Sequence, residues 1–168
     1  MPCACNIPLP NAPTNEIWGP IFWKLLHALA ENVGTTILDI YKPEEKLAWI
    51  NLIKSTEKVL PCPFCQIHYN EWLKKNNPQI LKAFDSIKMK IWISNFFWAL
   101  HQEVNKDNNK EGLSFDSLST LYKNVDIRTN IKELESIMKL VFQHNSVSII
   151  AWQNWLNQYK KLQSIYGL

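Results

Sequence analysis

Glycine, arginine and long apolar runs are scarce in this chain of 168 residues. Four glycines that nowhere follow the G-x-G-x-x-G or Walker spacing exclude a glycine-rich phosphate loop. Arg128 is the only arginine and the net charge is +3, which argues against nucleic-acid binding. Polar residues interrupt every apolar stretch well before the roughly 18 residues of a membrane span. Residues 1–6 do not resemble a signal peptide, so we expect a cytoplasmic protein.

The composition that remains is that of a helical globular protein. Hydrophobic residues make up 46% of the chain and aromatic residues 12%, including eight tryptophans. Apolar residues recur at helical spacing, without a convincing hairpin, and this pattern predicts an all-α fold. The expected helices cover about residues 16–33, 43–60, 62–75, 84–104, 114–122, 131–141 and 149–166. Ser114 is the expected N-cap of the fifth of these helices.

Three segments are expected along the chain. Four prolines in residues 1–14 predict a flexible arm. Residues 15–124 hold the helices of a bundle, and residues 125–168 form a helical C-terminal extension. In that extension Trp152, Trp155 and Tyr159 share one helix face, which we interpret as internal packing.

The four cysteines form two close pairs. Cys62 and Cys65 open a helix with Pro63 between them, and a helix N-terminus favours the thiolate by lowering the thiol pKa. Cys3 and Cys5 lie in the proline-rich arm, where a C-x-C disulfide would close a small, easily reduced ring. The pattern indicates a dithiol relay. The alternatives are zinc binding by the four thiolates, or spare thiols in the arm.

Three of the four histidines lie one helical turn from a tryptophan, a cysteine or an asparagine. These pairs are His27 with Trp23, His68 with Cys65, and His101 with Asn105. Such clustering predicts one shared ligand that is planar or charged. His144 has no such neighbour, and we interpret it as structural.

Three motifs in the same order resemble those of the Erv/ALR-type FAD-linked sulfhydryl oxidases. Residues 18–27 (WGPIFWKLLH) resemble the first-helix signature of that family. Residues 60–68 (LPCPFCQIH) resemble its P-C-x-x-C-x-x-H redox motif, and residues 101–105 (HQEVN) its flavin-binding H-N-x-V-N. The resemblance covers about residues 15–123 and is nearest to the versions encoded by large DNA viruses.

The resemblance implies a four-helix bundle with a short fifth helix and FAD at its mouth. Cys65 would lie next to the flavin, Cys62 would be the outer cysteine open to exchange, and Cys3 and Cys5 would be a shuttle pair. The residues implied to contact FAD are Gly19, Trp23, His27, Cys65, His68, His101, Val104, Asn105 and Lys110.

The implied activity is the formation of disulfides in dithiol protein substrates. Electrons would pass through Cys3/Cys5 and then Cys62/Cys65 to FAD and O2, giving hydrogen peroxide. No metal, nucleic acid or membrane is expected to take part. The family habit implies a homodimer through the first two helices, and a viral enzyme would act in the host cytoplasm or the virion.

The chain departs from the family pattern in ways that bear on the site. Gln102 replaces a usual asparagine, which implies an altered contact to FAD, and the structural cysteine pair of many cellular members is absent. Two other functions stay open. A thioredoxin-like dithiol oxidoreductase would need β-strands around the C-P-F-C motif, and a zinc-binding interaction module would use all four cysteines.

Overall fold

The regular structure of the described residues is entirely helical. The structure is a computed structural model and describes residues 12–144 and 146–168. It contains α1 (Asn15–Glu31), α2 (Lys42–Thr56), α3 (Pro63–Lys75), α4 (Ser86–Asp107), α5 (Leu118–Tyr122), α6 (Ile127–Gln143) and α7 (Ile149–Tyr166). Short 3-10 helices cover Asp39–Tyr41, Glu57–Val59, Pro78–Ala83 and Phe115–Ser117. Within those described ranges there is no β-strand, which confirms the all-α prediction.

Local sequence signals set most helix ends. Pro63 occupies the first position of α3, where its missing N–H has no helical partner to lose. Asp85 caps α4 by accepting a 2.8 Å hydrogen bond from the Lys88 amide. Gly34 takes a left-handed φ of 83° soon after α1 ends. Ser114 precedes a 3-10 helix rather than an α-helix, and its side chain makes no capping bond.

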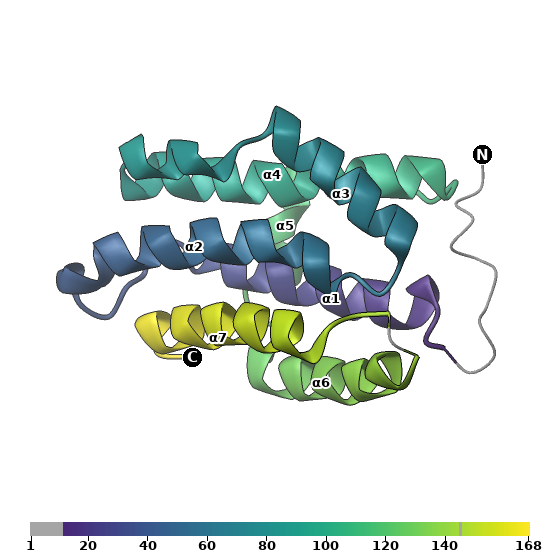
Figure 1. Cartoon of the computed structure of the whole chain (residues 1–168). Helices are drawn as coiled ribbons and strands as arrows, with labels where there is room; N and C mark the ends of the chain where they lie inside the picture. Colours follow the sequence, from purple (N-terminus) through teal and green to yellow (C-terminus); the bar gives the residue numbers. More distant parts are fainter. Residues whose placement is uncertain (1–11, 145) are drawn as a thin grey trace.

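The long helices lie in three layers (Figure 1). One layer contains α3 and α4, the middle layer α1 and α2, and the third layer α6 and α7. The short α5 packs against α1. Because α6 contacts α1 and α7 contacts α2, the C-terminal extension covers the middle layer on the side opposite α3 and α4.

The extension therefore shares one core with the rest of the described chain. Trp152, Trp155 and Tyr159 are buried, as their interpretation as internal packing predicts. The Trp155 indole N–H donates to Thr56 Oγ1 on α2 at 2.9 Å. The Tyr159 hydroxyl donates to the Leu25 carbonyl on α1 at 3.1 Å. Buried bonds of this kind fix the register of α7 as well as its position.

A buried carboxylate fixes the far end of α7. Glu45 on α2 is fully buried, and its Oε1 accepts hydrogen bonds from the Tyr166 hydroxyl at 2.6 Å and the Gly34 amide at 2.7 Å. The Trp49 indole N–H donates to the same Tyr166 hydroxyl at 2.7 Å. This network joins α2 and α7 to the turn after α1.

Candidate functional site

The chemistry predicted from the sequence converges on one cavity of about 550 Å³. Its walls come from α1 between Asn15 and Leu26, the end of α2, the first turns of α3, the second half of α4 and the end of α5. A cavity of this size falls in the range of small-molecule and cofactor sites. The connection between α4 and the 3-10 helix at Phe115–Ser117 brings Lys110 to the same cavity.

The two cysteines of α3 differ in their relation to the cavity. Cys62 is the N-cap of the helix, and its sulfur accepts a 3.3 Å hydrogen bond from the Cys65 amide. Cys65 lines the cavity, where the Asn15 side-chain amide donates to its sulfur at 3.9 Å. Cys62 is only 5% exposed and belongs to the core cluster.

Burial reverses the expected effect of the helix N-terminus at Cys65. Desolvation raises the pKa of its thiol to about 11, and the hydrogen bond from Asn15 opposes that rise only in part. The sequence predicts a lowered thiol pKa at this helix start, and for Cys65 that prediction is wrong. Cys65 lies in the first turn of α3, and there desolvation of the thiolate outweighs the stabilisation by the helix dipole.

Stacked rings form one wall of the cavity. Trp23 and His101 stack with centroids 4.2 Å apart and an interplanar angle of 9°. Behind them His27 stacks on Tyr122 at 4.7 Å, and its Nε2 forms a 3.1 Å hydrogen bond with His101 Nδ1. The rings come from α1, α4 and α5, so three helices build a flat, rigid surface.

Both imidazoles of this wall are neutral at pH 7. Desolvation, with a smaller repulsion from His101, lowers the pKa of His27 to about 3. Desolvation, followed by the charge of Lys110, lowers the pKa of His101 to about 4. The His27–His101 hydrogen bond consequently joins one neutral donor to one neutral acceptor.

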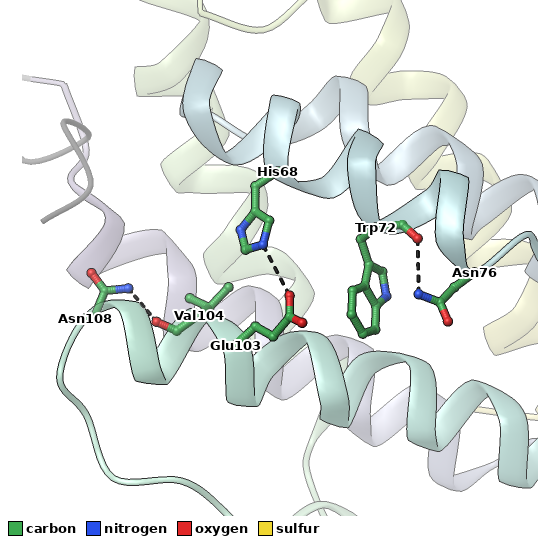
Figure 2. A network of polar contacts seen from close by, with 6 residues as sticks. All are labelled: His68, Trp72, Asn76, Glu103, Val104 and Asn108. Carbon is green, nitrogen blue, oxygen red and sulfur yellow. Dashed lines mark hydrogen bonds and ion pairs between the residues drawn. The ribbon is translucent and has the colours of Figure 1, made fainter. Parts of the chain in front are cut away.

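A polar contact links the cysteine helix to α4. His68 lines the cavity, and its Nε2 lies 3.4 Å from Glu103 Oε2 on α4, as Figure 2 shows. In the same view Asn108 donates to the Val104 carbonyl at 2.7 Å, at the C-terminal end of α4. The contact of His68 with Glu103 orients the His68 ring relative to α4.

Most of the predicted contact residues surround this cavity. Those among its lining residues are Gly19, Trp23, Cys65, His68, His101, Val104, Asn105 and Lys110. His27 is not a lining residue, and it contacts the wall from behind. Cys3 and Cys5 lie outside the described residues. His144 is the C-cap of α6 and does not line the cavity.

Several lining residues escaped the sequence analysis. They are Asn15, Trp18, Lys24, Leu100, Asn108 and Tyr122, among others. Trp18 and Lys24 lie within the first-helix motif, and this position could have identified them as candidate lining residues. Tyr122 had no such signal, because only the packing of α5 on α1 brings it to His27.

The described residues weigh against a thioredoxin-like function, and the zinc-binding alternative also involves Cys3 and Cys5, which lie outside them. A thioredoxin-like fold requires strands, which residues 12–144 and 146–168 do not contain. No group of three or more His, Cys, Asp or Glu side chains in those ranges could hold a metal ion. In the same part of the chain, no helix has the length and apolarity to cross a membrane.

Known proteins resemble this chain over the region that builds the cavity. A family model described as the Erv1 / Alr family matches residues 20–126. An African swine fever virus protein from a Kenyan pig isolate, named FAD-linked sulfhydryl oxidase, is 31% identical over 112 residues. A protein of the same name from a Malawian tick isolate is 33% identical over 114 residues. Each alignment covers 67% of this chain and 85% of the relative. No solved structure matches the chain.

Proposed function

This chain belongs to the Erv1 / Alr family, and we propose that it is a FAD-linked thiol oxidase that forms disulfides in dithiol protein substrates. One observation carries the proposal. Cys65, from a C-x-x-C motif at a helix start, lines the same cavity as the stacked Trp23 and His101 rings. A redox-active thiol beside a flat aromatic wall suits electron transfer to a planar cofactor.

The lining residues fit FAD by shape and by polarity. A Cβ added to Gly19 would meet no atom within 4 Å, so this position leaves open space beside α1. The buried indole N–H of Trp18 has no hydrogen-bond partner in the described structure and can donate to a ligand. Lys24 and Lys110 supply positive charge for phosphate groups.

The residues proposed to hold the cofactor are those of the cavity wall. From α1 and α3 they are Gly19, Trp23, Cys65 and His68, and from α4 and the following loop they are His101, Val104, Asn105 and Lys110. His27 acts from behind the wall, because its bond to His101 fixes the plane of that ring. Bound FAD supplies the two-electron acceptor between the cysteine pair and O2, with hydrogen peroxide as the product.

The cysteines carry electrons by disulfide exchange. A substrate thiolate attacks the Cys3–Cys5 disulfide, forming a mixed disulfide and releasing one arm thiolate. A second substrate thiolate attacks the substrate sulfur of that mixed disulfide, which leaves a substrate disulfide and two reduced cysteines in the arm. A thiolate of that pair then attacks Cys62 of the oxidised Cys62–Cys65 pair, and the Cys65 thiolate leaves. The second arm cysteine resolves the mixed disulfide, so that one electron pair has moved to Cys62 and Cys65. Cys65 lines the cavity, and the electron pair leaves the two cysteines from its sulfur.

The length of the arm is compatible with a relay inside one chain. Ala12 lies seven positions after Cys5, and a fully extended chain of that length spans at most about 25 Å. The described chain starts close to the cysteine pair, because Asn15 contacts Cys65. A short tether of this kind gives the arm a high effective concentration at Cys62.

The decisive experiment combines a visible spectrum with turnover of cysteine variants. We expect about one flavin per chain, with an absorption band near 450 nm. Cys62→Ser and Cys65→Ser should retain the band and lose oxygen consumption with a reduced protein. Cys3→Ser/Cys5→Ser should lose most of this activity, while Asn6→Ser in the same arm should not. A colourless protein with stoichiometric zinc would refute the proposal and favour the zinc-binding alternative.

A mixing experiment tests the relay within one chain. Cys62→Ser/Cys65→Ser lacks the inner pair, and Cys3→Ser/Cys5→Ser lacks the arm pair. A relay inside one subunit leaves their mixture inactive, whereas a relay across the expected homodimer restores activity in mixed dimers. Restored activity would overturn the single-chain relay and leave the oxidase assignment intact.

A further inference from the structure

The loop after α4 brings a lysine to the cavity and is held in place by α4 itself. Residues 108–114 connect α4 to the 3-10 helix at Phe115–Ser117. Asn109 takes a left-handed φ of 54°, and the Lys110 amide then donates to the Asn105 carbonyl at 2.8 Å. This turn places Lys110 among the lining residues.

Three α4 side chains on one helix face bind the returning loop. Trp98 donates its indole N–H to the Leu113 carbonyl at 2.7 Å, and Gln102 Oε1 accepts from the Leu113 amide at 2.8 Å. Asn105 donates to the Glu111 carbonyl at 3.3 Å. Because these residues are four and three positions apart, their side chains form one row along α4. Gln102 and Trp98 together bind both backbone groups of Leu113.

Gln102 and Gly112 fit each other closely. A Cβ added to Gly112 would lie 2.5 Å from Gln102 Oε1, far inside contact distance. Gly112 is not among the glycines with positive φ, so its backbone does not itself demand glycine. Glycine at this position therefore leaves room for the Gln102 carboxamide. The Leu113 amide requires an acceptor, which fixes the orientation of that carboxamide.

We propose that Gln102 is a positioning residue, which together with Gly112 holds the 108–113 loop against α4 and so keeps Lys110 at the cavity. The inference rests on the proposed function, because Lys110 is the loop's contribution to the FAD site. It replaces the expectation that Gln102 alters a direct contact with FAD. Gln102 is not a lining residue, and its Oε1 binds the loop instead.

A double-mutant cycle tests the pair. Gln102→Ala removes the acceptor, and Gly112→Ala displaces the same carboxamide with its methyl group. Each single variant should weaken FAD binding about fivefold, as the loss of one hydrogen bond does. The double variant should be no weaker than either, because both changes break the same contact. Gln153→Ala, at an exposed glutamine of α7, is the matched control.

Two further readouts separate positioning from general stability. The FAD dissociation constant of the wild type should rise with salt. It should rise less in the Gln102→Ala and Gly112→Ala variants, because Lys110 is no longer held in place there. Trypsin should cleave after Lys110 several-fold faster in the cofactor-free variants than in cofactor-free wild type, because the loop is released. Gln153→Ala should match wild type in both measurements.

The outcomes are distinguishable. Additive effects of the two substitutions, or unchanged affinity and cleavage in all variants, would overturn the positioning role of Gln102. Neither result would bear on the proposed oxidase function. If Gln102→Ala fails to fold, Gly112→Ala in the wild-type background must still give faster cleavage after Lys110. A wild type that binds no FAD would contradict the proposed function, and the cleavage pattern would still test the contact between Gln102 and the loop.

Discussion

Desolvation shifts the pKa values of one thiol and two imidazoles around the cavity, and the direction of the shift differs between the two kinds of group. Burial favours the neutral form of every group, so it raises the pKa of Cys65 and lowers those of His27 and His101. The wall of stacked rings is consequently uncharged at neutral pH. Among the lining residues, Lys24 and Lys110 supply the positive charge for an anionic ligand, and Glu16 and Asp107 are the acidic side chains.

The raised pKa of Cys65 predicts a steep pH dependence of its alkylation. In the cofactor-free Cys3→Ser/Cys5→Ser/Cys62→Ser variant, the iodoacetamide rate should rise about tenfold per pH unit from pH 7 to about 10. It should level off only near pH 11, the value to which burial raises the pKa. Asn15→Ala should slow alkylation at a given pH, because the lost hydrogen bond stabilises the thiolate. A plateau below pH 9 would contradict this account.

The two histidines predict a loss of stability on mild acidification. Their imidazoles have pKa values of about 3 and 4 in the folded protein, against 6.5 as the ordinary value. Between these values the unfolded chain binds more protons, so their contribution to stability is full above pH 6.5 and falls as the pH decreases. Urea unfolding of cofactor-free protein at pH 7, 6 and 5 measures this slope. His27→Phe should flatten it, and Ile150→Ala, at an exposed position of α7, should leave it unchanged.

At the scale of helices, the attachment of α7 depends on aromatic residues that also make hydrogen bonds. Trp155 is fully buried and bonded to Thr56. Trp155→Phe keeps most of the buried area and should reduce the free energy of unfolding by about 1 kcal/mol. Trp155→Ala leaves a cavity and should reduce it by about 3–5 kcal/mol. Ile150→Ala, at an exposed position of α7, should change it by less than about 0.5 kcal/mol. Denaturant titration measures all three, and equal values for the two Trp155 variants would contradict the packing role.

Helix positions were largely readable from the sequence because their end signals are local. Pro63 and the Asn77-Pro78 break bracket α3, and the apolar stripe of α7 coincides with its observed bounds. The 3-10 helix at Pro78–Ala83 was missed, because Pro78 was interpreted only as a helix stop. The apolar stripes identify the face that each helix buries, but they do not identify the helix that packs against that face. The packing of α6 on α1 and of α7 on α2 therefore emerged only from the structure.

The candidate site was likewise predictable from the sequence only where the signals are local. Helical spacing grouped His27 with Trp23 and His68 with Cys65, and the structure places these residues at or behind one cavity. The His27–His101 bond joins residues 74 positions apart, so no local pattern could indicate it. The burial that raises the Cys65 pKa is likewise a property of the packed molecule.

For the whole molecule, the shared core predicts one cooperative unfolding transition. Buried side chains of α6 and α7 belong to the same cluster as those of α1 and α2, so neither part should unfold alone. Far-ultraviolet circular dichroism and tryptophan fluorescence should give coincident urea curves. The eight tryptophans lie in α1, α2, α3, α4 and α7, so the fluorescence samples both the extension and the helices that it covers. A separate early fluorescence transition would show that the extension is an independent unit.

The same packing bears on the expected homodimer, which stays a prediction. Family habit places the contact on the first two helices, and here α6 and α7 cover one side of that layer while α3 and α4 cover the other. A second copy must therefore approach a different surface or an uncovered edge. A location in the host cytoplasm or in a virion also stays a prediction.

The hydrogen bonds that attach α7 have a consequence for how the protein matures. Trp155, Tyr159 and Tyr166 join the extension to α1 and α2 without any sulfur. The chain has four cysteines, and the proposed function uses all of them for electron transfer. A newly made chain can therefore build its scaffold in a reducing compartment before any thiol is oxidised. The catalyst needs no earlier oxidase to fold, and reductant can reset its cysteines without loosening the helices around them.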